Sequence, residues 1–171
     1  MKTTTVLRIG VIGVFCLMCV PSPLVLRADV PAAPSLTGTW SLVAADVLHT
    51  DGTRAHDYGA APKGLLLIDT HGHYSLQIFK AERPRFASGD KLTGTPAEYE
   101  AAVLGSSTHF GTISIDPVAG ILTFRIDGAS FPNWEGELQK RHYELKGDEL
   151  SYRVPPRPNG DTPISVWQRL K

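Results

Sequence analysis

Beyond residue 35 the chain is a series of short, apolar-rich segments separated by residues that favour turns. The length and spacing of these segments are typical of strands in an all-β sandwich or barrel. Eight strands are predicted, at residues 39–48, 64–69, 74–79, 108–116, 121–127, 136–145, 150–154 and 164–170. Because most connections are short, we expect an antiparallel up-and-down barrel, which removes the exposed edges of an open sheet and leaves room for one small ligand. Short additional strands would raise the number to as many as ten, and a flat sandwich is the alternative.

One segment, residues 95–104, departs from the strand pattern. It begins with Thr95 as a potential N-cap, followed by Pro and, three residues after the cap, by Glu98. This is the signature of a helix start, and Gly105 is a suitable stop. The apolar stripe of the helix would comprise Tyr99, Ala102 and Val103. Because so short a helix is not stable alone, we expect it to pack as a lid over one end of the sheet.

The first 28 residues have the three-part layout of a secretory signal peptide. Lys2 and Arg8 make the start positive, residues 9–20 form an uncharged apolar run, and Ala28 offers a small residue at the cleavage position. A membrane-spanning helix needs roughly 20 residues, more than this run supplies. We therefore expect cleavage after residue 28 and an exported protein, either periplasmic or secreted. The alternatives are a cut a few residues later and a retained N-terminal anchor.

Removal of this segment changes the composition of the chain. Residues 29–35 would form a Pro-rich linker and residues 36–171 a single domain, as the length of 171 residues favours. Both cysteines lie in the removed run, so we expect no disulfide. The 17 basic and 17 acidic residues become 14 and 17, a charge of about −3. Such a domain gives no reason to expect nucleic acid as a partner. We expect a monomer with no membrane span after cleavage.

Two motifs stand at the ends of the predicted barrel. Gly38-Thr-Trp40 opens the first strand, and Trp167-Gln-Arg169 closes the last. In lipocalins, a Trp at the first place packs beneath an Arg from the end of the chain, a contact that cation–π attraction stabilises. Further motifs follow in order between these two: Asp57-Tyr-Gly59, Pro62-Lys-Gly-Leu-Leu66, Gly72-His-Tyr74, Phe110-Gly111, Phe131-Pro-Asn-Trp134, Gln139 and Arg141.

Together these motifs resemble the lipocalin-like domain family of small, mostly bacterial proteins, over about residues 36–170. The resemblance implies a ligand-binding barrel, closed at one end by Gly38, Trp40 and Arg169, and no agreed enzymatic activity. The chain departs from the family pattern before the Pro-Asn-Trp segment, where Phe124 and Arg125 stand in places that often hold His. A function that depends on such histidines has no support here.

The predicted strand 136–145 carries the main candidate for ligand contact. Alternation places Gln139, Arg141 and Tyr143 on one face and the intervening residues on the other, and the mixed polarity of both faces leaves the inward face open. If Arg141 points inward, its guanidinium could hold a ligand carboxylate or enolate through paired hydrogen bonds. A buried Arg is costly without a partner, so the alternative is an Arg tied to an acidic residue near the barrel end.

Other candidate residues belong to the wall or rim of the barrel. Asn133 and Trp134 lie in an aromatic connection between two predicted strands and would line the open mouth, as rim loops of barrels often do. The alternative is a hydrophobic plug that fixes the turn. Tyr74 and Phe124 would contribute apolar wall.

Catalytic and metal chemistry have little support in the sequence. His71 and His73 flank a hairpin Gly and supply at most two metal ligands, so we expect no metal and no cofactor. No nucleophile elbow, phosphate loop or zinc-protease motif is present in the sequence.

Three functional hypotheses remain open. The first is an exported carrier of a small hydrophobic molecule, oriented by Arg141, Gln139 and Asn133. The second is an isomerase, cyclase or hydrolase acting on a small hydrophobic or polyketide-like substrate, with Arg141 stabilising an oxyanion. The third is an envelope interaction protein whose barrel is filled by side chains.

Overall fold

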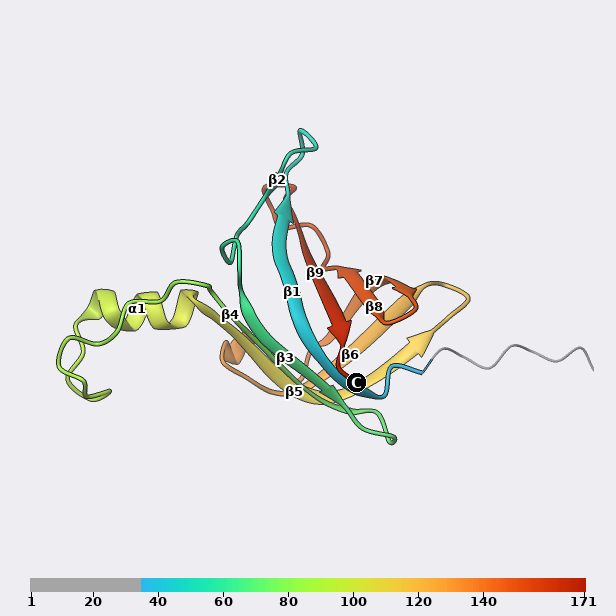
Figure 1. Cartoon of the computed structure of the whole chain (residues 1–171), viewed down its shortest axis with the longest axis horizontal. Coiled ribbons are helices and arrows are strands. Elements are labelled where there is room, and N and C mark those ends of the chain that lie inside the picture. Colours follow the sequence, from blue (N-terminus) through green and yellow to red (C-terminus); the bar gives the residue numbers. More distant parts are fainter. Residues whose placement is uncertain (1–34) are drawn as a thin grey trace, which may run out of the picture. The chain divides into compact units, whose positions relative to one another are not determined.

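The computed structural model describes residues 35–171. The predicted signal peptide and residues 29–34 of the predicted linker lie outside the described residues. The elements follow in this order (Figure 1): β1 Gly38–Leu48, β2 Arg54–Ala55, β3 Lys63–Ile68, β4 His73–Phe79, α1 Pro96–Leu104, β5 Ser106–Asp116, β6 Ile121–Ala129, the 3-10 helix η1 Pro132–Trp134, β7 Leu138–Lys146, β8 Glu149–Arg153 and β9 Thr162–Arg169.

The strands form a closed antiparallel barrel. β1 pairs with β3, each later strand pairs with the one before it, and β9 returns to pair with β1. Eight strands therefore complete the ring, which confirms the predicted up-and-down barrel and makes the flat sandwich wrong. β2 is an extra two-residue strand on the end of β1, too short to leave a pattern in the sequence.

Each of the eight predicted strands differs from the observed strand by one or two residues at one end or at both. The strand expected at 136–145 begins at Leu138, because Gly136 and Glu137 belong to the turn after η1. Gly136 has φ of 83°, a left-handed conformation that suits glycine, and the Glu137 amide donates to the Trp134 carbonyl at 3.0 Å.

Alternation along the strands builds the core. On β6, Leu122, Phe124 and Ile126 are fully buried, whereas Arg125 and Asp127, which flank Ile126, are exposed. The same period of two holds on β4 and β8, so one side chain in two points into the barrel. The largest fully buried side chains are Trp40, Trp167, Tyr152 and Phe124.

One end of the barrel is closed by Trp40 and Arg169. The two residues pair across β1 and β9, and the Cζ atom of Arg169 lies 4.0 Å from the centre of the Trp40 ring. Trp40 is fully buried, and its Nε1 donates to the Leu36 carbonyl at 2.9 Å. Gly38 has φ of 134°, and a Cβ there would lie 3.1 Å from Arg169 Nη1. The close approach of the guanidinium thus favours glycine at this position.

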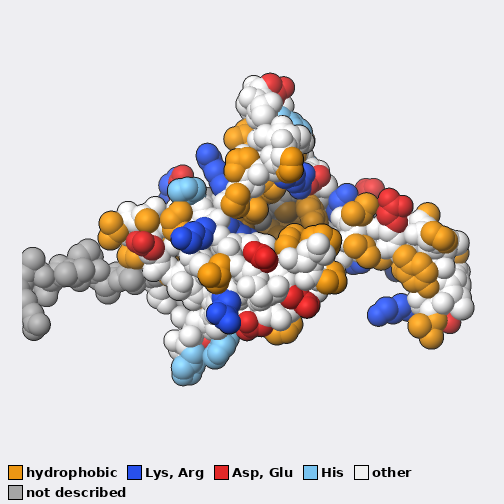
Figure 2. Space-filling view, turned by 180° about the vertical axis from the view of Figure 1, so that it is seen from behind, with side chains coloured by type: hydrophobic (Ala, Val, Ile, Leu, Met, Phe, Trp, Pro, Cys, Tyr) orange, Lys and Arg blue, Asp and Glu red, His pale blue; other side chains and the backbone are white. Residues whose placement is uncertain are grey.

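Helix α1 starts as the sequence predicts but is not a lid. The Thr95 side chain accepts from the Glu98 amide, and the Glu98 side chain accepts from the Thr95 amide at 2.7 Å. No residue of the helix is buried, and 57% of Val103 is exposed. The reason is local packing: Tyr99 packs edge-on against Phe86 in the preceding loop, with ring centres 5.3 Å apart. The helix projects away from the barrel next to the start of β5 (Figure 1), and hydrophobic side chains gather on this segment (Figure 2).

Within residues 35–171, no helix combines the length and the apolar character needed to cross a membrane.

Candidate ligand-binding site

A cavity of about 390 Å³ lies inside the barrel. Its walls come from the last residues of β1 and β4, the first residues of β5, β7 and β9, and the segment after β8. These are the ends of the strands away from Trp40 and Arg169. A volume of this size is typical of sites for small molecules. The barrel is therefore not filled solid by side chains, as the third functional hypothesis would require.

Arg141 lies on β7 with its side chain inside the barrel and 5% of its surface exposed. This settles which face of the strand points inward. Gln139 and Tyr143 share the inward face with Arg141, whereas Leu138 and Lys140 are exposed.

The Arg141 guanidinium is held by neutral groups. Its Nη2 donates to Gln139 Oε1 at 2.7 Å and lies 3.3 Å from His109 Nε2. Its Cζ atom stands 4.2 Å from the centre of the Phe124 ring and 4.9 Å from that of Tyr152. The cation therefore lies against two aromatic faces, whose negative potential attracts it.

The expected alternative of an Arg tied to an acid is wrong. None of the ion pairs within residues 35–171 includes Arg141, and its Nε–H has no hydrogen-bond acceptor there. Asp46, a buried acid in the cavity wall, is already paired with Arg54 at 2.6 Å and with His56 at 3.0 Å. The wall thus carries a guanidinium charge that no carboxylate contacts in this part of the chain.

His109, on β5, joins Arg141 to Tyr74. Its Nδ1 lies 2.7 Å from Tyr74 Oη, and 3% of the residue is exposed. Because a guanidinium only donates, Nε2 is the acceptor for Arg141, and the Nδ1–H then donates to Tyr74. Burial, and secondly the charge of Arg141, lowers the pKa of His109 to about 3, so the imidazole is neutral at physiological pH. Burial also raises the pKa of the Tyr74 hydroxyl.

Sequence reasoning missed His109 because it counted the residue only among scattered histidines. Strand periodicity was the signal that could have found it. His109, Gly111 and Ile113 share one face of the predicted strand, and adjacent β4 places Leu76 opposite His109.

Three of the six residues predicted to contact a ligand line the cavity, and the other three, Tyr74, Phe124 and Asn133, do not. Arg141, Gln139 and Trp134 line the cavity, and the Trp134 ring centre lies 6.0 Å from that of His109. The buried Tyr74 and Phe124 rings pack behind this lining. Their centres are 5.0 Å apart in an edge-to-face arrangement. Asn133 is exposed on η1 and is not among the cavity-lining residues.

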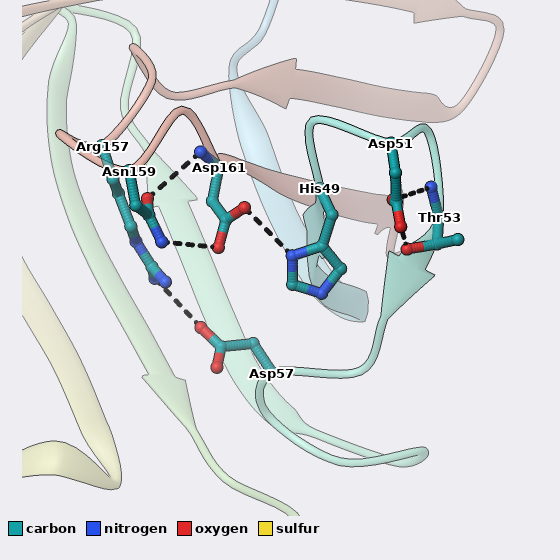
Figure 3. A network of polar contacts seen from close by, with 7 residues as sticks. All are labelled: His49, Asp51, Thr53, Asp57, Arg157, Asn159 and Asp161. Atoms are coloured by element: carbon teal, nitrogen blue, oxygen red, sulfur yellow. Dashed lines mark hydrogen bonds and ion pairs between the residues drawn. The ribbon is translucent and has the colours of Figure 1, made fainter.

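Two loops meet at the edge of the cavity (Figure 3). Arg157, after β8, donates from Nη2 to Asp57 Oδ2 at 3.0 Å, and both residues line the cavity. His49 Nδ1 lies 3.0 Å from Asp161 Oδ1. The other carboxylate oxygen of Asp161, Oδ2, accepts a hydrogen bond from the side-chain amide of Asn159 at 2.9 Å. These contacts join the segment around β2 to the connection between β8 and β9.

Within residues 35–171, no cluster of three His, Cys, Asp or Glu side chains could hold a metal ion. His73 instead contacts Asp69, with Nδ1 2.9 Å from Oδ2. The hydrogen bond from the His73 side chain is the largest cause that lowers the pKa of the Asp69 carboxyl to about 2, and the backbone amides of His73 and His71 lower it further.

Comparison with known proteins places this chain in a family. A family model described as a lipocalin-like domain matches residues 37–170, almost all of the described chain. The chain belongs to the lipocalin-like domain family. The lipocalin-like barrel supports a binding-protein kind of function.

A lipocalin-like protein from Bacteroides uniformis ATCC 8492, known from a crystal structure, is similar to this chain at 14% sequence identity. The similarity covers 79% of this chain and 98% of that one, with a TM-score of 0.41. A search of curated proteins finds no match.

Proposed function

We propose that this lipocalin-like protein binds and carries a small hydrophobic molecule in the barrel cavity, with the polar end of the molecule toward Arg141 and Gln139. The observation that carries the proposal is the cavity itself, whose wall combines apolar side chains such as Ile78, Tyr152 and Val154 with this polar cluster. Convergence of a few polar groups in an apolar pocket is the usual composition of a small-molecule site.

Both the apolar and the polar side chains of the cavity wall are needed to bind a ligand tightly. Each buried methylene group of a ligand contributes about 0.8 kcal/mol, so a chain of about eight such groups contributes roughly 6 kcal/mol. Association costs at least about 4 kcal/mol in lost freedom of motion. Apolar burial alone therefore leaves weak binding, and contacts with the polar end must supply the remainder.

The proposal includes export, to the periplasm or the medium, and a monomeric state. The support for export is the signal-peptide layout of the first 28 residues. The test is the intact mass of the protein recovered from its own host. A chain that starts near residue 29 supports export, and a full-length chain in the cytosol contradicts it.

A barrel enzyme is the second candidate, because His109 and Tyr74 lie beside the Arg141 cation. A general base works best when its pKa is near the operating pH, and the pKa of His109 is about 3. This property favours the carrier. The two candidates can be separated by incubating the protein with a molecule that it binds in its host and analysing the mixture for a changed product. Turnover favours the enzyme, and an unchanged molecule favours the carrier.

The binding test uses N-phenyl-1-naphthylamine, an uncharged dye that fluoresces in apolar surroundings. We expect saturable binding by the wild-type protein and loss of binding in Val154→Trp, where the larger side chain enters the cavity. Val118→Trp is the matched control, since Val118 is 97% exposed in the turn between β5 and β6. Equal binding by Val154→Trp and the wild type would show that the dye lies elsewhere and would overturn the proposal.

A further inference from the structure

The charged groups around the cavity leave one charge uncompensated within residues 35–171. Asp57 and Arg157 pair with each other at 3.0 Å. Asp46 is paired with Arg54 and His56, as described above. His109 is neutral at physiological pH, and the remaining charge in the cavity wall is the Arg141 guanidinium.

The hydrogen-bonding capacity of Arg141 is also incompletely used. A guanidinium has five N–H donors, and the contacts with Gln139 and His109 both involve Nη2. The Nε–H group has no acceptor in the described part of the chain. Phe124 and Tyr152 present ring faces, which attract the cation but accept no strong hydrogen bond.

The position of Arg141 also favours contact with a ligand. Arg141 lines the cavity, and its neighbour Gln139 holds one end of the guanidinium in place at 2.7 Å. A planar, fixed guanidinium is suited to an oxygen pair such as a carboxylate. A neutral polar group would leave the buried charge uncompensated, which is costly for a side chain removed from water.

We propose that the ligand is a hydrophobic monoanion, whose carboxylate, enolate or phenolate oxygen pairs with the Arg141 guanidinium. This inference rests on the proposed binding function and specifies the chemistry of the ligand. The alternative head groups, an alcohol or a cation, would not neutralise Arg141.

The test is displacement of bound N-phenyl-1-naphthylamine by decanoate and by decanol, which share an apolar chain and differ in the head group. At neutral pH we expect decanoate to displace the dye at about tenfold lower concentration than decanol, because hydrogen bonds between charged groups are stronger than neutral ones. In Arg141→Met the advantage of decanoate over decanol should disappear.

Lys140→Met is the matched control. Lys140 directly precedes Arg141 on β7 and is exposed on the opposite face. Its substitution by Met also removes one positive charge. We expect this variant to keep the wild-type preference for decanoate. Thermal melting of both variants checks that they fold, and the wild-type comparison of decanoate with decanol needs no variant.

Each outcome separates the two proposals. If the dye does not bind the wild-type protein, the proposed binding function fails. If the dye binds but decanol displaces it as well as decanoate does, the function stands and the anion inference is overturned. If decanoate is preferred equally by Arg141→Met and the wild type, Arg141 is not the partner of the anion, and the inference is again overturned.

Discussion

Arg169→Met tests the closed end of the barrel, because it keeps much of the side-chain length and removes the guanidinium. The lost contacts are the stacking on Trp40 at 4.0 Å, the hydrogen bonds to the Thr37 and Ser35 carbonyls, and an ion pair with Asp148 at 3.4 Å. Stacking contributes about 1 kcal/mol, and the two hydrogen bonds about 1 kcal/mol each, since the side chain is 22% exposed. The ion pair adds little at the surface.

The expected loss is therefore about 3 kcal/mol in the free energy of unfolding, or roughly 10 °C in Tm for a domain of this size. Urea unfolding followed by tryptophan fluorescence measures this loss, and the m value should not change. Arg125→Met is the control, because 69% of the Arg125 side chain is exposed and the change should stay within about 0.5 kcal/mol. Equal stability of the two variants would refute the assigned role of Arg169.

Three further predictions concern pH, the helix and the rim. The pKa of His109 is lowered in the folded state, so the unfolded chain binds the extra proton, and stability should fall as pH drops from about 6.5 toward 3. Urea unfolding at pH 7 and pH 5 should show about 2 kcal/mol of this loss in wild type, and His109→Gln should lack that part. Thr95→Ala removes the N-cap and should speed amide hydrogen exchange within α1, with global unfolding almost unchanged because the helix buries no residue; a large drop in global stability would contradict this. Arg157→Gln breaks the pair with Asp57 and should raise the dissociation rate of N-phenyl-1-naphthylamine by about twofold to fivefold, measured by stopped flow; an unchanged rate would show that the two loops do not retain the ligand.

The barrel was predictable from the sequence because its strands alternate with period two and are separated by turn residues. The contact of Trp40 with Arg169 was expected from the resemblance of their motifs to those of lipocalins, and the guanidinium lies 4.0 Å from the ring. Strand β2 was not predictable, because two residues cannot show a period. The N-cap of α1 was local and was found, whereas the packing of the helix depends on Phe86, a loop residue without periodic signal.

The candidate site was predictable only in part. Alternation grouped Gln139 with Arg141 but could not choose the inward face, because both faces of β7 carry polar and apolar residues. His109 comes from a different strand, and its contact with Arg141 depends on how the barrel closes. Asn133 shares the Trp134 segment, yet the 3-10 turn leaves Trp134 half-buried and Asn133 exposed. The sequence therefore identified the segment that reaches the cavity but not which of its side chains points toward the cavity.

A crystal structure of the protein with a terminally brominated decanoate tests the central claim most directly. The anomalous signal of bromine would locate the tail, and the electron density would locate the carboxylate. The account predicts the tail inside the cavity between Ile78 and Val154 and the carboxylate within hydrogen-bond distance of Arg141. Bromine bound only at the exposed apolar segment of α1, or a carboxylate directed away from Arg141, would contradict it.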